Sequence, residues 1–507
     1  MTLAIVYSRA TVGIQSPLVI VEVHLSKGLP RFNMVGLPET VVKESKDRVR
    51  SALLNSHFKF PRGRITINLA PADLPKESSR FDLAIALGIL KASGQLITNR
   101  LEECEFIGEL ALSGELRAVS GVIPVVIGAH KAKRSLIIPD ANVSEAALIK
   151  QASVLAGKHL REVCTYLQEK KGLIHCNPAP LIPSANDYQS DLSHVRGQLH
   201  AKRVLEIAAA GRHNLLLAGP PGTGKTLLAN CLPSILPDII EEQACEMAAV
   251  ASISHGGFDA SQWGVLPFRA PHHSSSVAAL IGGGRHPHPG EISLAHHGVL
   301  FLDELPEFNR QVLEALREPL ESGYITISRA AGQIVFPAKF QLIAAMNPCP
   351  CGYIGSSQGD CRCTMEQVDR YWAKLSGPLM DRFDMQIVVP SLPLEMLLTS
   401  ESCVEESKVV KIRVIAARKR QWCRQAGCNQ DLSVSHIQEF CFLNKELKEM
   451  MADAVHALNL SARAYYRLLR VARTIADLDE SEMILNTHLS EAVAHRRPVS
   501  LKIGRLK

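Results

Sequence analysis

Residues 219–226 carry the residue types that bind a phosphate chain, in the order Gly-Pro-Pro-Gly-Thr-Gly-Lys-Thr. This order fits the phosphate-binding loop G-x-x-x-x-G-K-[ST], in which glycines let backbone N–H groups turn towards the phosphates. The helix expected after the loop adds the partial positive charge of its N-terminus. Lys225 is expected to reach the β- and γ-phosphates, and the Thr226 hydroxyl is expected to bind Mg²⁺. The predicted nucleotide-binding residues are Gly219, Pro220, Pro221, Gly222, Thr223, Gly224, Lys225 and Thr226.

A second segment supplies the acids that such a loop needs for hydrolysis. The apolar run Val299–Leu302 reads as a buried strand and delivers Asp303 and Glu304 at its end. Asp303 is expected to hold Mg²⁺, and Glu304 is expected to orient and polarise the attacking water. Either segment alone could be accidental, but the ordered pair predicts hydrolysis of a nucleoside triphosphate, with ATP as the expected substrate.

Four thiols are clustered at Cys349, Cys351, Cys361 and Cys363, with several glycines between them. Zinc prefers four thiolates in a closed, structural site that leaves no position open for chemistry. The cluster is therefore a candidate structural Zn²⁺ site. Its C-x-C spacing is tighter than the usual C-x₂-C, so unbound thiols in a reducing compartment are the alternative.

Composition limits the kind of protein without identifying it. A length of 507 residues predicts three or four domains, and a hydrophobic fraction of 46% is normal for globular chains. No apolar run reaches the roughly 18 residues of a membrane span. The N-terminus lacks the basic region and cleavage pattern of a secretory signal, so we expect a cytoplasmic protein with reduced cysteines and no membrane partner. A net charge of +6 permits nucleic-acid binding without requiring it.

The pattern of apolar residues divides the chain into four parts. Alternating runs such as Leu18–Val23 and Arg64–Leu69 read as strands, and Val41–Leu54 and Phe81–Leu90 read as helices. A proline-rich stretch then reads as a linker, and the part after the nucleotide module is mostly helical. The predicted parts are an α/β domain at 1–170, a linker at 171–189, a nucleotide module at 190–390 and a helical domain at 391–507.

Two further motifs lie between the phosphate-binding segment and the strand that ends in the two acids. Phe268–His273 reads Phe-Arg-Ala-Pro-His-His, and Gly290–His296 reads Gly-Glu-Ile-Ser-Leu-Ala-His. Together these segments resemble the magnesium-chelatase-like AAA+ ATPases, and most closely the ComM/YifB family, over essentially the whole chain. The resemblance implies an AAA+ core with a parallel sheet, a C-terminal helical lid and a ring, expected to be a homohexamer. It also implies a DNA helicase that drives branch migration in natural transformation, with single-stranded and branched DNA and recombinase machinery as partners.

The same resemblance assigns three further catalytic residues. Asn347 follows the apolar run Phe340–Ala345 and is expected to touch the γ-phosphate and the attacking water, although Asn-Pro is also a common turn initiator. Arg382 lies in a segment similar to the one that carries an arginine finger, which would act across a subunit boundary.

Both arginine assignments have alternatives. Arg382 could instead form a local ion pair with Asp381 or Asp384, and Arg370 is the reserve candidate for the finger. In the lid, Arg463 matches an arginine that touches the γ-phosphate. Its rivals are Arg467, Arg470 and Arg473, which could simply line a solvated helix face.

Two loops are the candidate DNA contacts. The insertion Phe268–His297 contains six histidines without the spacing of a catalytic zinc site, and it carries Arg285 after a glycine triplet. Tyr324–Phe336 reads as a β-hairpin that bears Arg329 near its tip. Both loops could equally be elements that pack at an interface. Basic residues between Lys408 and Arg424, and in the tail from His495, are either solvated helix faces or phosphate contacts.

The first domain resembles the Lon-type peptidase fold, whose members use a serine–lysine pair. The serine position falls at Phe81 or Asp82, and the lysine position falls near Ile123. Without a nucleophile and a base, we predict that this domain is not a protease and serves as a scaffold or a guide for DNA. An ATP-driven metal-insertion motor of the magnesium-chelatase type and an ATP-dependent protease are the alternative functions.

Overall fold

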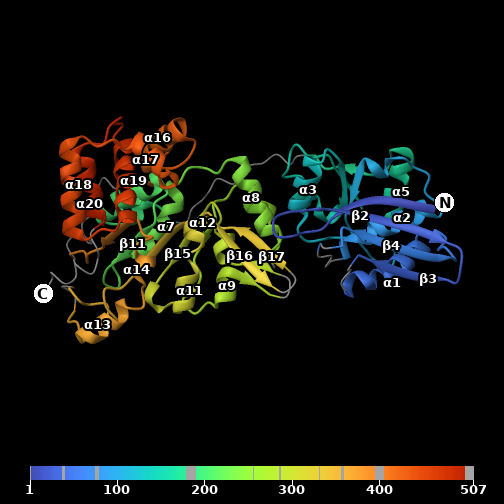
Figure 1. Cartoon of the computed structure of the whole chain (residues 1–507), viewed down its shortest axis with the longest axis horizontal. Coiled ribbons are helices and arrows are strands. Elements are labelled where there is room, and N and C mark those ends of the chain that lie inside the picture. Colours follow the sequence, from blue (N-terminus) through green and yellow to red (C-terminus); the bar gives the residue numbers. More distant parts are fainter. Residues whose placement is uncertain are drawn as a thin grey trace.

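The computed structural model describes residues 2–36, 40–72, 74, 79–177, 190–254, 256–284, 287–329, 332–355, 359–393 and 405–496. An N-terminal α/β domain lies at one end of an elongated molecule, an α/β core lies in the middle, and a helical domain caps the other end (Figure 1). This arrangement agrees with the predicted fold class. Within the described ranges, no helix combines the length and the apolar character needed to cross a membrane.

The N-terminal domain is built on a mixed eight-stranded sheet in the order β10-β9-β8-β5-β1-β2-β4-β3. In β2, alternate residues Val19, Val21 and Val23 are buried, as expected for a strand with one face on a core. Gly88 of α2 lies so close to this face that an added Cβ would approach Val23 Cγ2 to 2.5 Å. The main elements are β1 (Thr2–Arg9), β2 (Leu18–Ser26), β3 (Arg31–Val35), β4 (Arg64–Ala70), β5 (Cys104–Phe106), β8 (Ser135–Pro139), β9 (Val154–Gly157) and β10 (Ile174–His175), with α1 (Thr40–Asn55), α2 (Asp82–Ala92), α3 (Val122–Lys131), α4 (Val143–Ala146) and α5 (Leu160–Glu169).

The predicted strands and helices of this domain are confirmed, and its sheet extends further than expected. Strand β10 pairs with β9 inside the segment 171–189 that the sequence predicts to be a linker. The Cys176 N–H also donates to the Val154 carbonyl at 3.0 Å. The domain therefore continues past residue 170, and residues 178–189 of the predicted linker lie outside the described residues.

The core contains a five-stranded sheet in the order β12-β15-β18-β11-β19, with every pair parallel. Its central strands are buried on both faces, which explains why they are continuous apolar runs without alternation. The elements are β11 (Leu215–Ala218), β12 (Phe268–Arg269), β15 (Val299–Leu302), β18 (Gln341–Met346) and β19 (Met385–Val388), with α6 (Leu199–Gly211), α7 (Lys225–Ile235), α8 (Glu241–Ser252), α11 (Arg310–Ala315), α12 (Pro319–Ser322), α13 (Met365–Trp372) and α14 (Gly377–Met380). Short insertions add α9 (Val277–Ile281), α10 (Glu291–Leu294), β13 (Gly282–Gly283), β14 (His288–Pro289) and the hairpin β16 (Tyr324–Arg329) and β17 (Gly332–Pro337).

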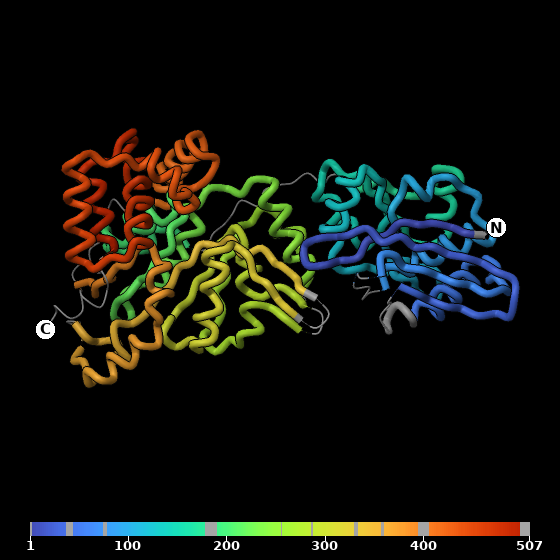
Figure 2. Tube along the Cα trace, in the orientation of Figure 1, coloured from blue at the N-terminus to red at the C-terminus, as the bar shows by residue number. Residues whose placement is uncertain are grey.

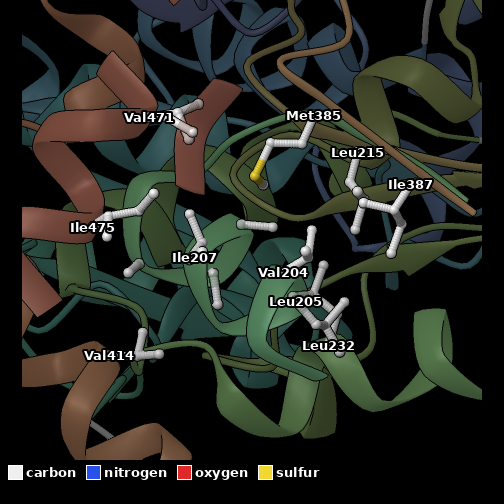
Figure 3. Close-up of a cluster of buried hydrophobic side chains, with 14 of the residues drawn as sticks. Val204, Leu205, Ile207, Leu215, Leu232, Met385, Ile387, Val414, Val471 and Ile475 are labelled. Atoms are coloured by element: carbon white, nitrogen blue, oxygen red, sulfur yellow. The ribbon is translucent and has the colours of Figure 1, made fainter. Parts of the chain in front are cut away.

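The C-terminal helices share one hydrophobic core with one face of this sheet. Figure 3 shows Ile207 of α6 and Ile387 of β19 in the same cluster as Val414 and Ile475 of the helical domain. A shared core of this kind fixes the helical domain beside the phosphate loop helix α7. Its elements are α16 (Ser407–Gln425), α17 (Val434–Phe440), α18 (Lys445–Leu458), α19 (Ala462–Leu478) and α20 (Asn486–Arg496).

The N-terminal domain touches the core at two places. Ile123 of α3 packs against Ala248 and Ala249 of α8, and the Gly121 N–H donates to the Ser252 carbonyl at 3.1 Å. At the second place, the turn between β1 and β2 meets the hairpin β16–β17 (Figure 2). A Cβ built on Gly13 in that turn would lie 3.1 Å from Ile334 Cγ2.

Candidate nucleotide-binding site

The predicted phosphate loop connects the carboxyl end of β11 to the N-terminus of α7. Gly222 and Gly224 have φ values of +77° and +85°, which a residue with a Cβ adopts only with strain. The Lys225 ammonium lies at the head of α7 and donates to the carbonyls of Gly219 and Pro220 at 2.7 Å each. The loop therefore has the curled backbone and the central cation that a phosphate chain requires.

Lys225 is held in an unusually dry environment for a cation. The residue is 8% exposed. Burial lowers the pKa of its ammonium to about 8, and the nearby carboxylates of Asp303 and Glu304 oppose that shift. Because its close partners are neutral oxygens, an anionic group within reach would favour the charged form.

The two predicted magnesium ligands lie beside each other. The Thr226 hydroxyl donates to Asp303 Oδ2 at 2.7 Å, and the Glu304 backbone N–H donates to Asp303 Oδ1 at 2.9 Å. Hydroxyl and carboxylate oxygens on adjacent elements are the donor types that Mg²⁺ takes when phosphates and water complete its shell. These residues fit the ion that the sequence predicts.

Glu304 is placed by an uncommon backbone conformation. Its φ is +52°, in the left-handed region that a side chain with a Cβ rarely occupies. His273 Nδ1 lies 3.4 Å from Glu304 Oε2. His273 belongs to the Phe-Arg-Ala-Pro-His-His motif, yet sequence reasoning gave it no role at this carboxylate.

Asn347 follows β18, the strand between β11 and β15. Its Oδ1 accepts a hydrogen bond from the Lys225 ammonium at 3.2 Å. The order of parallel strands thus brings Asn347, Lys225 and Asp303 to one edge of the sheet. This position is the one predicted for a residue that contacts the γ-phosphate.

Arg382 is enclosed by its own chain and is 4% exposed. Its guanidinium donates to Glu321 Oε2 at 2.6 Å, to the Pro378 carbonyl at 2.7 Å and to the Arg317 carbonyl at 3.1 Å. The local ion pair considered from sequence involved Asp381 or Asp384, but the partner is Glu321. That carboxylate lies at the end of α12, 61 residues earlier in the chain, and sequence spacing gave no signal for it.

Glu321 also binds the lid. Its second oxygen, Oε1, accepts a hydrogen bond from Arg463 Nη2 at 2.8 Å, and the Arg463 side chain is 53% exposed. The rival lid arginines have other partners. Arg467 forms an ion pair with Asp384 at 3.2 Å, and Arg473 donates a hydrogen bond to the Glu482 carbonyl at 2.7 Å. Arg470 likewise donates to the Leu432 carbonyl, and the reserve Arg370 pairs with Glu366 on α13.

The arginine pair lies at the amino ends of the parallel strands, whereas the phosphate loop lies at their carboxyl ends. Strands β11 and β19 run parallel, with Leu215 level with Met385. Arg382 precedes β19, whereas the loop follows β11, so a four-residue strand, about 13 Å long, separates the two edges. Arg382 and Arg463 therefore lie away from the phosphate loop of their own chain.

The four cysteines converge, as the sequence predicts. Cys349 Sγ lies 3.4 Å from Cys351 Sγ and 3.7 Å from Cys361 Sγ, and the Cys351 N–H donates to Cys363 Sγ at 3.4 Å. Tetrahedral Zn–S bonds imply sulfur–sulfur distances of about 3.8 Å, so the set fits zinc. Burial opposes ionisation, but N–H groups of Tyr353 and Arg362 lower the pKa of Cys351 to about 6.

The cysteine loop also lies directly against the phosphate loop. Gly352 has a φ of +85°, and a Cβ there would approach Pro221 Cδ to 2.7 Å. Trp372 of α13 donates its indole N–H to the Pro348 carbonyl at 3.1 Å. A bound metal would therefore stiffen a segment that supports the phosphate loop.

The histidine-rich insertion forms a hydrogen-bonded cluster with a distant acid. His296 Nε2 and His297 Nε2 lie 3.0 Å and 2.7 Å from Glu246 Oε2 of α8. The Lys339 N–H donates to His296 Nδ1, so a neutral His296 carries its proton on Nε2 and donates it to Glu246. This cluster joins α8 to the segment that precedes β15.

The candidate DNA contacts are only partly described. Arg285 lies outside the described residues. The predicted hairpin is confirmed as β16–β17, and the backbone of Arg329 pairs with Gly332 at its tip.

The basic stretch on α16 differs from both sequence-based interpretations. Five of its seven cations are bound within the chain, because acids and carbonyls come from elements remote in sequence. These contacts are Lys411 to Asp238, Arg413 to Glu206, Arg418 to the Ala209 carbonyl, Arg420 to Glu480 and Arg424 to Asp477. In the tail, Arg496 is buried beside Asp381, and later residues lie outside the described ranges.

The two positions that correspond to the serine and lysine of the peptidase family are occupied by other residue types. Asp82 is fully buried and pairs with Arg48 Nε at 2.8 Å, and burial raises the pKa of Asp82 although this pairing opposes the shift. Ile123 is buried at the contact with α8. Asp82 and Ile123 therefore do not form the serine–lysine pair of the peptidase family.

Family comparisons cover almost all of the chain. A model described as "Magnesium chelatase, subunit ChlI" matches residues 191–397, "Subunit ChlI of Mg-chelatase" matches 21–142, and the corresponding C-terminal model matches 404–496. The "Uncharacterized protein YifB" of Escherichia coli is 51% identical over 98% of this chain and 97% of its own length. The "Competence protein ComM" of Haemophilus influenzae is 51% identical over 99% of each chain. The "Magnesium-chelatase 67 kDa subunit" of Heliobacterium mobile is 27% identical over 31% of this chain and 28% of its own.

Proposed function

Because the chain belongs to the magnesium-chelatase-like AAA+ family that includes YifB and ComM, we propose that it is an ATP-driven motor acting on DNA. Its substrates are single-stranded and branched DNA, and its role is helicase-driven branch migration of incoming DNA during natural transformation. The name of the Haemophilus relative, a competence protein matched along the full chain, supports this role. The motor works in the cytoplasm as a homohexameric ring, together with recombinase machinery.

The observation that carries the ATPase half of the proposal is the cluster at the carboxyl edge of the sheet. Lys225 contacts Asn347 at 3.2 Å, and Thr226 contacts Asp303 at 2.7 Å. Thr226 and Asp303 would hold Mg²⁺, which neutralises charge on the β- and γ-phosphoryl oxygens when bound. Lys225 releases its loop carbonyls and binds those oxygens instead.

The remaining residues act on the attacking water. Glu304 orients the water and accepts its proton, and His273, 3.4 Å from the carboxylate, limits the positions that this side chain can take. Asn347 holds the water and the γ-phosphate from the adjacent strand. The strained backbone at Glu304 supports such a role, since strain of this kind gathers at working sites.

The location of Arg382 and Arg463 supports a ring. Both lie at the edge opposite their own phosphate loop, and Glu321 joins them into one unit. In a ring, the exposed Arg463 of this unit faces the nucleotide of the next copy, and the buried Arg382 has to release Glu321 before its charge can stabilise the transferred phosphoryl group. Arg382 acts as the finger and Arg463 reports the nucleotide state to the lid.

Glu321 further connects this arginine pair to the hairpin. It lies in the last turn of α12, and β16 begins at Tyr324. A change at the neighbouring nucleotide that moves Arg382 or Arg463 therefore moves the base of β16–β17. Arg329 at its tip, and Arg285 in the glycine loop, are the proposed contacts to DNA.

The test is ATP-dependent strand displacement on forked and three-stranded DNA. We expect displacement by the wild type, and none by Lys225→Ala or Glu304→Gln. Arg117→Ala is the matched control, because Arg117 is an exposed arginine that pairs with Glu109 in the N-terminal domain, away from the nucleotide site. A purified, assembled protein that hydrolyses ATP but neither binds nor remodels any DNA would refute the proposal. ATP-dependent insertion of a metal, or cleavage of an unfolded protein, would then identify one of the alternative functions.

A further inference from the structure

The end of the N-terminal domain that lies away from the core carries a group of cations for which no role has emerged. We call this group the basic end, and its members are Lys27, Arg31, Arg50, Lys59, Arg62 and Arg64. All six are exposed. They come from two separate segments of sequence and from helix α1.

The strand register brings the two segments together. Segments 24–35 and 57–66 contain five of the six cations and no aspartate or glutamate. Arg64 of β4 is level with Ser26 of β2 on one side and with Arg31 of β3 on the other. Neighbouring strands lie roughly 4.8 Å apart, so Arg31 and Arg64 are side by side on the same face. Lys27 and Arg62 continue the group beyond the strand ends.

Helix α1 adds the sixth cation. The Arg50 guanidinium carbon lies 5.4 Å above the centre of the Phe60 ring. Phe60 stands between Lys59 and Arg62 in the loop that leads into β4. The ring therefore anchors Arg50 beside the other cations without neutralising it.

No acid compensates for this charge. Across the described ranges, no carboxylate lies within 4.0 Å of any of the six, whereas six other cations of the domain have such a partner, such as Arg9 with Glu105 at 2.5 Å. Like charges placed opposite each other on paired strands destabilise a sheet. Arg31 and Arg64 are like charges in this position, so their pairing does not stabilise the sheet and points to a function outside it.

Protection of an edge strand does not account for the group. Strand β3 is the edge of the sheet, and a charged edge discourages pairing with other chains. Only Arg31 lies on β3, at its first residue. The other cations lie just after β2, in the loop before β4, on the first residue of β4 and on α1, at one end of the sheet and not along its edge.

The basic end is remote from the ATP site and accessible. The β1–β2 turn contacts the core, and the nine-residue strand β2 leads away from it, so about 30 Å separates the basic end from that contact. Figure 1 shows β3 on the part of the domain that faces away from the core. Leu29, in the turn between β2 and β3, is 88% exposed.

We propose that the basic end binds the phosphate backbone of DNA. A run of unpaired, exposed cations with an aromatic ring among them binds regularly spaced phosphates mainly by releasing condensed counterions. This inference rests on the proposed function, since a motor on DNA gives the domain its substrate. It assigns the N-terminal domain a second DNA contact, outside the ring, that holds the strand before or after the motor acts on it.

The test uses the full-length protein with Arg31, Arg62 and Arg64 each changed to Gln. Binding of a labelled single-stranded oligonucleotide is measured by fluorescence anisotropy over a range of salt concentrations, with a non-hydrolysable ATP analogue present. Each lost phosphate contact removes about 0.7 from the slope of log K against log salt, so the slope is expected to fall by about two. ATPase activity without DNA is expected to stay unchanged.

Two matched variants separate this effect from a general loss of charge or of folding. Arg117→Gln with Lys158→Gln removes exposed cations of the same domain that pair with Glu109 and Asp140, and it is expected to leave the slope unchanged. Arg31→Lys, Arg62→Lys and Arg64→Lys together keep the charge and are expected to keep the slope.

Each remaining outcome has a defined meaning. A wild type that binds DNA, with an unchanged slope in the Gln variant, overturns the basic end as a DNA contact and leaves the proposed function standing. A wild type that binds no DNA overturns the proposed function itself. Loss of binding to acidic lipid vesicles in the Gln variant, with DNA binding intact, overturns the inference in favour of a membrane surface.

Discussion

At the scale of single residues, the buried cation of Lys225 lowers the stability of the nucleotide-free protein. A cation that is 8% exposed, with carbonyl and amide oxygens as its hydrogen-bond partners, gives up more hydration than it regains. The depressed pKa of about 8 records this imbalance. Phosphate oxygens would reverse it, so the same side chain that weakens the free protein strengthens the complex.

This imbalance predicts a pH-dependent difference between the wild type and Lys225→Met. The unfolded chain holds the lysine proton up to a pKa near 10.4, whereas the folded chain releases it near 8. Between these values the unfolded state binds more protons, so the stability of the wild type rises with pH relative to the variant. We expect Lys225→Met to melt higher at pH 7 without nucleotide, and the gap to shrink between pH 8 and pH 10. A gap that is constant or grows with pH in thermal melts would contradict this prediction.

Glu321 provides the second prediction at this scale. Glu321→Gln replaces a charged acceptor that binds Arg382 and Arg463 with a neutral amide, and because Arg382 is buried, the loss of its carboxylate partner should also lower stability. We expect ATP turnover to fall about tenfold, because the arginines lose their orientation towards the neighbouring nucleotide. Nucleotide affinity should stay unchanged, since the phosphate loop lies at the other edge of the sheet.

Glu480→Gln is the control for that change, because Glu480 is an exposed acid that pairs with Arg420 within the helical domain. Turnover and ATP affinity are measured side by side for both variants. Equal losses in the two variants would mean that Glu321 has only a local structural role.

At the scale of elements, the cysteine loop is the segment whose stiffness matters most for the phosphate loop. Cys349→Ser and Cys361→Ser should each abolish metal binding, lower the thermal midpoint and weaken ATP binding, because Gly352 lies against Pro221. Elemental analysis of the purified wild type should find close to one zinc per chain. A content under about half an ion per chain would argue strongly against a structural site.

The same scale shows what sequence could and could not predict. Patterns within one segment were sufficient for the phosphate loop, for the acids after β15, for β16–β17 and for the cysteine cluster, because their geometry is set by neighbours in sequence. Contacts between remote segments were not predictable. The acids that neutralise α16, such as Glu206 and Asp477, come from other helices, so a stretch that looked free is mostly paired.

The spacing of residues in the sequence also did not predict hydrogen-bond partners that lie far apart along the chain. Glu321 lies 61 and 142 residues before its two arginines, and Glu246 lies 50 residues before His296. Nothing in the local pattern of any of these residues identifies the partner. The strand order of the sheet decides it, and that order is a property of the packed domain.

At the scale of the whole molecule, α8 links the N-terminal domain to the acidic strand. One side of α8 packs Ala248 and Ala249 against Ile123 of the N-terminal domain. Its Glu246 binds His296 and His297, and β15, which leads to Asp303 and Glu304, begins two residues later at Val299. A displacement of the N-terminal domain is thus transmitted through one helix to the segment that precedes the catalytic acids.

Ile123→Asp tests this link. An aspartate at a fully buried apolar contact costs about 3 kcal/mol, so the interface between α3 and α8 should open while each domain keeps its own core. We expect one thermal transition for the wild type and two for the variant, and an increased radius of gyration in X-ray scattering for the variant. Leu112→Asp, at an exposed position of the same domain, should change neither. ATPase activity without DNA should remain within about twofold of the wild type, because the phosphate loop is untouched, whereas its stimulation by DNA should be lost. Retention of full stimulation after the domains separate would show that α8 carries no signal to the acidic strand.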